Sequence, residues 1–196
     1  MNNNILRYGL VGAFMGAAIV WIFISTGGYL GIGRVMNTQI DAHFIEQMIP
    51  HHEDAITMAQ IALDKAKRPE IKQLAQSIIS SQGEEILQMK DWYKLWYGRE
   101  LPIGDQAMQH HGMMSGSGMH MGMMGDDTDI ERLTQATDFD RAFIEDMIPH
   151  HQMAVMMANM LKSGNARPEM KKLADDIITA QTEEINQMRQ WYDAWL

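Results

Sequence analysis

The chain has 196 residues, which is enough for one ordinary domain with a buried core or for two small ones. It carries 25 acidic and 16 basic residues, and the resulting net charge of −9 disfavours binding to nucleic acid, whose phosphates attract a basic surface. There is no cysteine, which excludes disulfides, thiolate metal sites and cysteine nucleophiles, whereas methionine, with 20 residues, is unusually abundant.

Residues 1–34 form an apolar N-terminal segment. No charged residue lies between Arg7 and Arg34, and the apolar part of this stretch comes close to the roughly 20 residues that a helix needs to cross a bilayer. We expect an anchor in the inner membrane; the alternative is a signal segment that is removed after export. Both interpretations place residues 35–196 outside the cytoplasm, in the periplasm or an equivalent compartment.

Residues 35–100 predict a helical hairpin. Apolar side chains recur at steps of three and four residues in both halves of this region, which is typical of amphipathic helices. The periodicity breaks over Asp64–Lys67. Pro69 and Glu70 then suit the first turn of a second helix, because proline needs no hydrogen-bond partner there and a carboxylate is favourable beside the positive end of the helix dipole.

The linker, residues 101–137, has an unusual composition. Its central part, Met108–Met124, holds seven methionines and three histidines separated by glycine and serine. Thioether sulfur is a soft, neutral donor that selects Cu(I) and, by the same softness, Ag(I), and imidazole also binds copper. We predict a soft-metal site; the alternative is a connection whose methionines pack on the protein or on a partner. The candidate ligands are Met108, His110, His111, Met113, Met114, Met119, His120, Met121, Met123 and Met124.

Residues 138–196 repeat the first hairpin. Positions 41–96 and 140–195 align without a gap at an offset of 99, and about half of the aligned residues are identical. Because a lone hairpin cannot cover its apolar face, we predict that the two hairpins pair into an all-α four-helix bundle.

The motif Met-Ile-Pro-His-His occurs in both copies, at Met48–His52 and Met147–His151. Its methionine and second histidine lie one helical turn apart on the same face, and its proline should kink the helix. Two adjacent histidines with a methionine one turn away favour a metal site. The alternative is a pair of structural histidines that bond to a facing carboxylate or amide. These facing residues would be Glu85, Glu184, Gln82 and Gln181, and further sulfur donors along the helices are Met58, Met153, Met156, Met157 and Met160.

Other side chains give weaker indications. No glutamate precedes a histidine by three positions, so the di-iron signature of four-helix bundles is absent. Most acidic residues are expected on the solvated surface, with Glu85 and Glu184 as exceptions by their spacing. The tryptophans and tyrosines at the end of each copy are expected to close one end of the bundle.

The motif Phe-Ile-Glu-x-Met-Ile-Pro-His-His, with the later Arg-Pro-Glu and Trp-Tyr elements, resembles a bacterial family of unknown function whose CopM-type branch binds copper. The resemblance covers residues 38–196 and implies a ferritin-like bundle, export to the periplasm, and binding of Cu(I) and Ag(I) in copper tolerance. The ligands that it implies are Met48, His51, His52, Met147, His150 and His151, with the linker as a further site.

We therefore expect an extracytoplasmic protein that binds Cu(I), and also Ag(I), for sequestration, delivery or tolerance, and that is not an enzyme. Its expected partners are copper ions and copper export or sensing proteins. The rival interpretation is a metal-dependent oxidoreductase with its site in the bundle core, which would need an open coordination position and a shaped pocket.

Overall fold

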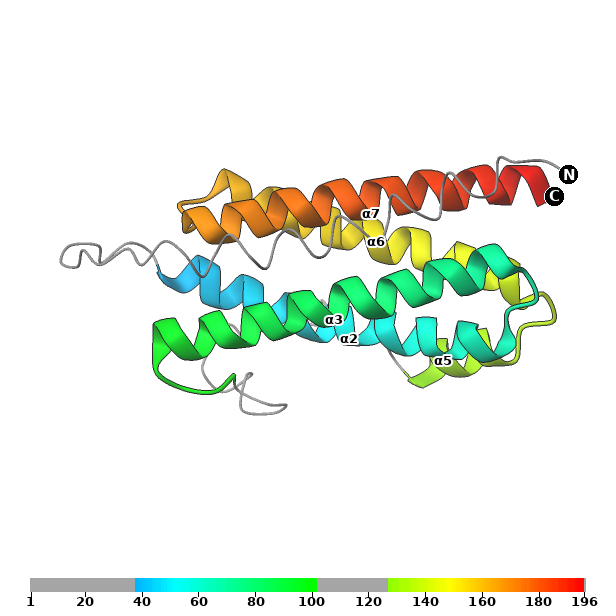
Figure 1. Cartoon of the computed structure of the whole chain (residues 1–196), viewed down its shortest axis with the longest axis horizontal. Coiled ribbons are helices and arrows are strands. Elements are labelled where there is room, and N and C mark those ends of the chain that lie inside the picture. Colours follow the sequence, from blue (N-terminus) through cyan, green and yellow to red (C-terminus); the bar gives the residue numbers. More distant parts are fainter. Residues whose placement is uncertain (1–37, 102–126, 196) are drawn as a thin grey trace, which may run out of the picture. The chain divides into compact units, whose positions relative to one another are not determined.

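The computed structural model describes residues 38–101 and 127–195, and within these ranges it contains five helices and no strand (Figure 1). The helices are α2 (Thr38–Lys65), α3 (Pro69–Tyr97), α5 (Asp127–Thr134), α6 (Phe139–Ser163) and α7 (Pro168–Trp195). None of these described helices is both long and apolar enough to cross a membrane. The predicted anchor and the Met/His-rich part of the linker lie outside the described residues. The all-α prediction is confirmed.

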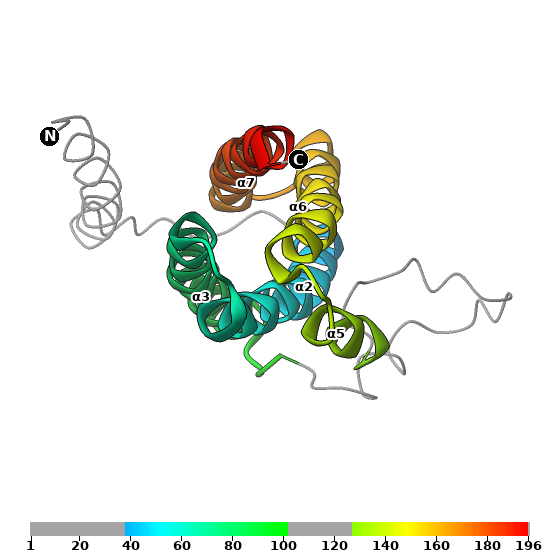
Figure 2. The same cartoon turned by 90° about the vertical axis from the view of Figure 1, so that its right-hand side faces the viewer.

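The four long helices form a bundle of two hairpins. Helix α2 packs along α3, α6 packs along α7, and α2 and α6 are in contact with each other, so these two helices join the hairpins (Figures 1 and 2). Helix α5 lies beside α2 and α6 and places Ile130 and Leu133 against the core. This short helix lies within residues 101–137, which the sequence analysis interprets as linker, so α5 was not predicted.

The second helix of each hairpin begins at a proline, as predicted. Helix α3 begins at Pro69 and α7 at Pro168, each in the first-turn position that suits proline. After α3, Gly98 has a left-handed backbone with φ 67°, and its N–H donates to the Lys94 carbonyl. Helices α2 and α6 continue through Pro50 and Pro149, so these prolines do not end their helices.

Two buried aspartates connect the hairpins. Both carboxylate oxygens of Asp140 in α6 accept backbone N–H groups of the α2–α3 turn, from Lys67 and Arg68, at 3.0 Å each. In the other direction, Asp41 in α2 accepts the backbone N–H of Arg167 in the α6–α7 turn at 3.3 Å and pairs with its guanidinium. The side chain of Arg68 makes no capping bond at the start of α3. Each hairpin therefore holds the turn of the other through backbone hydrogen bonds.

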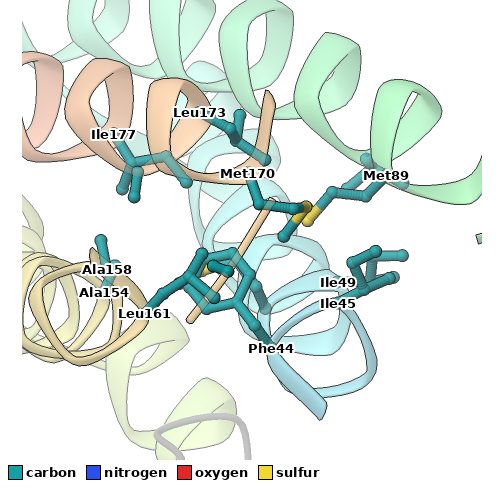
Figure 3. Close-up of a cluster of buried hydrophobic side chains, with 14 of the residues drawn as sticks. Phe44, Ile45, Ile49, Met89, Ala154, Ala158, Leu161, Met170, Leu173 and Ile177 are labelled. Carbon is teal, nitrogen blue, oxygen red and sulfur yellow. The ribbon is translucent and has the colours of Figure 1, made fainter. Parts of the chain in front are cut away.

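The hydrophobic core is divided into two clusters. The first contains the beginning of α2, the end of α3, the end of α6 and the beginning of α7, and Figure 3 shows side chains from all four helices meeting there. The second contains the opposite halves of the same helices. The polar residues of the Met-Ile-Pro-His-His motifs fall between the two sets of positions, so a polar layer crosses the middle of the bundle.

The terminal aromatic residues lie at two ends of the bundle, so the prediction that they close one end is wrong. Trp195 of α7 lies 3.9 Å beneath the guanidinium of Arg68, in the α2–α3 turn. The ring centroid of Trp96 in α3 lies 4.3 Å from the guanidinium of Arg167, in the α6–α7 turn. Helices α3 and α7 finish at opposite ends (Figure 1), and the same aromatic element of each repeat is therefore carried to a different end.

Candidate metal centre

The two Met-Ile-Pro-His-His motifs meet at the centre of the bundle. Because α2 and α6 pack against each other, His51 of the first copy faces His150 of the second, with ring centroids 3.8 Å apart. His52 and His151 lie beside them, 6.3 and 6.2 Å away from their neighbours in sequence. All four histidines are buried. We call His51 and His150 the inner pair, and His52 and His151 the outer pair.

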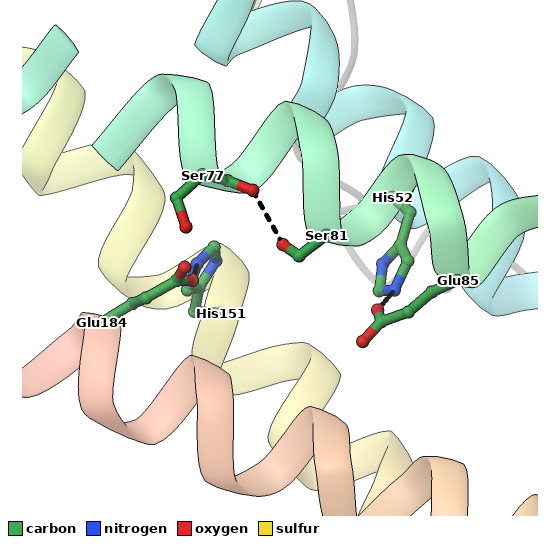
Figure 4. A network of polar contacts seen from close by, with 6 residues as sticks. All are labelled: His52, Ser77, Ser81, Glu85, His151 and Glu184. Atoms are coloured by element: carbon green, nitrogen blue, oxygen red, sulfur yellow. Dashed lines mark hydrogen bonds and ion pairs between the residues drawn. The ribbon is translucent and has the colours of Figure 1, made fainter. Parts of the chain in front are cut away.

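Each outer histidine bonds to a glutamate on the partner helix of its own hairpin. His52 Nε2 lies 2.6 Å from Glu85 Oε2, and His151 Nε2 lies 2.7 Å from Glu184 Oε2 (Figure 4). The glutamates are partly hydrated, with side chains 19% and 16% exposed. Because a carboxylate only accepts, the Nε2 atom of each ring carries a proton and donates it. The structural alternative named these contacts correctly.

The same bonds leave the other ring nitrogen available. With the proton on Nε2, the Nδ1 atom of each outer ring has a free lone pair, and it is buried without a hydrogen-bond partner. A histidine that binds a metal through one nitrogen usually donates the other N–H to a carboxylate or carbonyl, which fixes the ring. The contacts with Glu85 and Glu184 are therefore compatible with a ligand role as well as with a structural one.

The inner pair has no partner with good hydrogen-bond geometry, although the backbone of each histidine lies near the ring of the other. Neither ring nitrogen of His51 or His150 makes a contact with hydrogen-bond geometry, and the neighbouring Gln82 and Gln181 also have unpaired buried atoms. In all, nine buried side-chain nitrogen and oxygen atoms of these histidines and glutamines are unpaired among the described residues. Native proteins contain few buried polar groups without a partner, and such groups often bind water or an ion.

Burial keeps the inner rings neutral. Removal from water, reinforced by the neighbouring imidazoles, lowers the pKa of His51 to about 3. The same burial, with the facing ring of His51 as the next cause, lowers the pKa of His150 well below its ordinary value. At neutral pH both rings therefore keep a lone pair and carry no positive charge that would repel a cation.

The layer is not a complete cage of hard ligands. Among the described residues, no three His, Asp or Glu side chains are arranged to hold an ion. Met48 and Met147, the methionines one turn before the outer histidines, are fully buried at the borders of the two hydrophobic clusters. The donors that the layer offers are thus imidazole nitrogens next to buried thioethers, a set that suits soft ions better than Zn²⁺ or Mg²⁺.

The remaining predicted ligands are not brought to the layer. Met58 is buried in the second cluster, and Met157 packs at the edge of the first. The ten linker residues predicted as ligands lie outside the described residues. Of the other acidic residues, Glu46 accepts from the hydroxyl of Tyr93 at 2.6 Å, and Glu145 accepts from that of Tyr192 at 2.6 Å.

Sequence reasoning missed two features of the bundle. It treated each motif by itself and did not anticipate that His51 and His150 would touch, although a repeat whose halves pack symmetrically brings equivalent residues together. It also did not single out Asp41 and Asp140, whose roles depend on contacts more than 70 residues away along the chain. For these aspartates the available indication was the first residue of the repeat, which is identical in both copies.

Comparison with known proteins identifies the family. The family model of DUF305, a domain of unknown function, matches residues 41–192. The chain belongs to this family. The fold agrees: CopM in its Cu(II)-bound form is 53% identical and has a TM-score of 0.68, over 80% of this chain and 97% of that chain. The Cu(I)-bound and Ag-bound forms of CopM, 49% and 48% identical, each have a TM-score of 0.65 over 79% of this chain and 96% of that chain.

Two more distant relatives complete the comparison. A DUF305 fragment from Deinococcus radiodurans is 28% identical, with a TM-score of 0.63 over 80% of this chain and 97% of that chain. The uncharacterized protein L153 of Acanthamoeba polyphaga mimivirus is 42% identical over 60 residues, which are 31% of this chain and 40% of that protein. The predicted resemblance to the CopM type is confirmed by the CopM structures.

Proposed function

We propose that this DUF305 protein binds Cu(I), and also Ag(I), as cargo in the polar layer at the centre of its bundle. The observation that carries the proposal is the inner pair: two buried, neutral imidazoles in contact, with no hydrogen-bond partner for any of their four nitrogens. The CopM structures in Cu(I)-, Cu(II)- and Ag-bound forms support the choice of ion.

Because no three of the described His, Asp or Glu side chains are arranged to hold one ion, each ion would be held by at most two imidazole nitrogens, from the inner pair or the Nδ1 atoms of the outer pair, together with the thioethers of Met48 and Met147. Glu85 and Glu184 would hold the outer rings in the binding orientation through their Nε2 atoms. Imidazole and thioether donors are neutral, so the bound ion keeps its positive charge. The two partly hydrated carboxylates beside the layer would offset that charge.

The role that fits best is sequestration or delivery of the ion, without catalysis. An enzyme would need a cavity that admits a substrate to the metal. A surface hollow of about 310 Å³ lies along α6 and α7 near Tyr192, and its lining contains no histidine. We further propose that the protein works outside the cytoplasm with its first 34 residues in the inner membrane, and that it exchanges copper with export or sensing proteins. This placement rests on the apolar N-terminal sequence.

An anaerobic Cu(I) titration against a chromogenic chelator tests the proposed site. The double variant His51→Leu with His150→Leu should lose at least one bound Cu(I), or weaken its binding more than tenfold. The control is His43→Ala, because His43 is exposed and the equivalent residue of the second copy is Ala142. Unchanged stoichiometry and affinity in the double variant would contradict the proposal. A bound copper that cycles between its oxidation states with turnover of a substrate would favour the oxidoreductase instead.

A further inference from the structure

Equivalent faces of the two hairpins differ in how well they are covered. Tyr93 of α3 and Tyr192 of α7 are equivalent, and the hydroxyl of each donates to the equivalent glutamate of its own hairpin at 2.6 Å. Tyr93 is nevertheless fully buried, whereas Tyr192 is partly exposed. The isoleucine before the motif proline differs in the same direction, because Ile49 is buried and Ile148 is partly exposed. The second hairpin therefore lacks a cover that the first one has.

The segment that follows α3 provides the cover of the first hairpin. The guanidinium of Arg99 donates to the hydroxyl of the buried tyrosine at 3.1 Å. Two residues later, Leu101 packs against the first hydrophobic cluster, to which this tyrosine belongs. Between them, Glu100 forms an ion pair with Lys94 of α3. We call residues 98–101 the covering segment; it contributes one guanidinium, one carboxylate and one aliphatic side chain.

The equivalent face of the second hairpin carries a hollow of about 310 Å³. We call it the α6–α7 hollow, and its lining consists of Ile144, Glu145, Ile148, Arg189, Tyr192 and Asp193. Ligand pockets in proteins begin at about 300 Å³, so the hollow has room for a side chain of the size of leucine. Ile148 belongs to the second Met-Ile-Pro-His-His motif, so an occupant of the hollow would lie beside the polar layer.

The charges at the α6–α7 hollow indicate the chemistry of its occupant. Arg141 already donates to the tyrosine hydroxyl of its own hairpin at 3.1 Å, so the guanidinium that Arg99 provides in the first hairpin is present. At the position of Lys94, which pairs with Glu100, the second hairpin has Asp193. Because the charge at this position is reversed, a segment that covers the hollow needs a basic residue where the covering segment has a glutamate.

The other charges of the hollow do not alter this requirement. Glu145 accepts from Arg141 and from the hydroxyl of Tyr192, so it is already bonded within its own hairpin. Arg189 stands where the first hairpin also has a basic residue, Lys90. Among the charged residues that line the hollow, the one whose sign differs from its equivalent is therefore the aspartate on α7.

We propose that the α6–α7 hollow is a docking site for an extended segment of a partner protein in which a basic residue directly precedes a leucine or a similar aliphatic residue. The aliphatic side chain fills the hollow beside Ile144 and Ile148, and the basic side chain pairs with Asp193. Apart from the reversed charge, such a segment has the chemistry of residues 100–101. The site goes beyond the proposed function, because none of the residues that line it is a proposed metal ligand.

The parts of this chain outside the described residues do not supply such a segment. Residues 102–126 contain no Lys or Arg. In residues 1–37, the basic residue that directly precedes an aliphatic one is Arg34, four residues before the start of α2 at Thr38. Four residues span at most about 14 Å. Helix α2, with 28 residues, is about 42 Å long and separates Thr38 from the end of the bundle near Tyr192. These observations favour a separate partner.

A synthetic peptide tests the site on the full chain, held in detergent and labelled at its isoleucine methyl groups. The peptide Gly-Arg-Lys-Leu-Pro, with both ends blocked, copies residues 98–102 with lysine in place of the glutamate. Titrated into the millimolar range, it should shift the methyl resonances of Ile144 and Ile148. The resonances of Ile45 and Ile49, on the covered face of the first hairpin, should not move.

Two matched peptides separate the contributions of the charge and of the leucine. Gly-Arg-Glu-Leu-Pro, which has the sequence of the chain itself, should bind about two- to fivefold more weakly, the effect of one exposed ion pair. Gly-Arg-Lys-Ser-Pro should bind more than tenfold more weakly, because it buries no aliphatic side chain. Equal affinity of all three peptides would show unspecific attraction and would overturn the proposal.

A charge reversal on the protein gives an independent test. Asp193→Lys places the lysine of the first hairpin at the hollow, and the glutamate peptide should then bind more tightly than the lysine peptide. Asp193 is exposed, so the variant should fold. The control Glu183→Lys makes the same change of net charge at an exposed position of α7 that does not line the hollow, and it should keep the preference for lysine. An unchanged preference in Asp193→Lys would contradict the predicted ion pair.

Three other results would also overturn the proposal. The first is the absence of shifts at Ile144 and Ile148. The second is peptide binding that occurs only after deletion of Met108–Met124, because the linker itself would then fill the hollow. The third is self-association of the protein that shifts the same resonances without peptide, which would assign the hollow to a second copy. The variant His51→Leu with His150→Leu should still bind the peptide, so the docking site and the metal site can fail separately.

Discussion

The inner histidines should destabilise the metal-free protein, and their replacement should increase its free energy of unfolding. The rings of His51 and His150 are buried and in contact, yet none of their nitrogens has a hydrogen-bond partner. A buried polar group without a partner costs about 1–3 kcal/mol. Leucine has a similar volume and no polar atom. The double variant His51→Leu with His150→Leu should therefore gain about 2–6 kcal/mol, less what is lost from the contact between the rings.

The glutamates of the outer pair should behave in the opposite way. Glu85 and Glu184 each accept a short bond from a buried imidazole. Hydrogen bonds to charged groups contribute about 1.5–3 kcal/mol each. Glu85→Ala with Glu184→Ala leaves both Nε2 atoms unpaired and should reduce the free energy of unfolding by about 3–6 kcal/mol. Neighbouring polar residues of one layer thus have opposite effects on stability.

Urea unfolding followed by circular dichroism, in the presence of a strong metal chelator, measures both effects. The midpoint should move in opposite directions for the two double variants, and the dependence on urea should stay the same, because the buried surface hardly changes. Added Cu(I) should stabilise the wild type, since an ion that binds only the folded state adds free energy of unfolding. A metal-free inner-pair variant that is less stable than wild type by more than about 1 kcal/mol would refute the reasoning. Its histidines would then be structural.

Four further results are expected. The pKa of His51 is about 3 in the folded protein and about 6.5 in the unfolded chain, so between these pH values only the unfolded chain takes up a proton. The free energy of unfolding of the metal-free protein should therefore decrease below pH 6.5, by about 1.4 kcal/mol per pH unit. Urea titrations at several pH values measure this slope, and His51→Leu should reduce it. Asp140→Ala should cost about 2 kcal/mol in the same assay, because two backbone N–H groups lose their acceptor. Deletion of Met108–Met124 should lower the Cu(I) capacity and leave the helical circular dichroism unchanged, and equal capacity would exclude the linker as a site. A carbonate wash should leave the protein with the membranes, whereas release of a shortened soluble form would show that residues 1–34 are cleaved.

The helices and their pairing could be predicted because they depend on local chemistry. Steps of three and four between apolar residues define the helices, and Pro69 and Pro168 mark their beginnings. The partner of each outer histidine could also be predicted, because Glu85 and Glu184 lie on the inner face of the second helix of the same hairpin. These contacts span 33 residues and one turn.

Contacts between the hairpins could not be derived in the same way. Amphipathic faces require the hairpins to pack, but they do not fix the direction in which the hairpins pack. That direction decides whether Trp96 and Trp195 share one end, and it decides which residues meet across the centre. A ligand role and a structural role of the outer histidines are also compatible, because an imidazole has two nitrogens. Bonding of Nε2 to a glutamate leaves Nδ1 available.

The reciprocal aspartate contacts make the two hairpins a single folding unit. Asp140 accepts the backbone N–H groups of the α2–α3 turn just before α3, and Asp41 accepts that of the α6–α7 turn just before α7, so the turn of each hairpin in isolation would lose its acceptor. An isolated hairpin would also expose its inner histidine, whose ring packs on the ring of the other copy. Tandem repeats often unfold one after another, because each repeat touches only its neighbours. Here neither hairpin is complete alone, so the two copies should unfold together in a single cooperative transition.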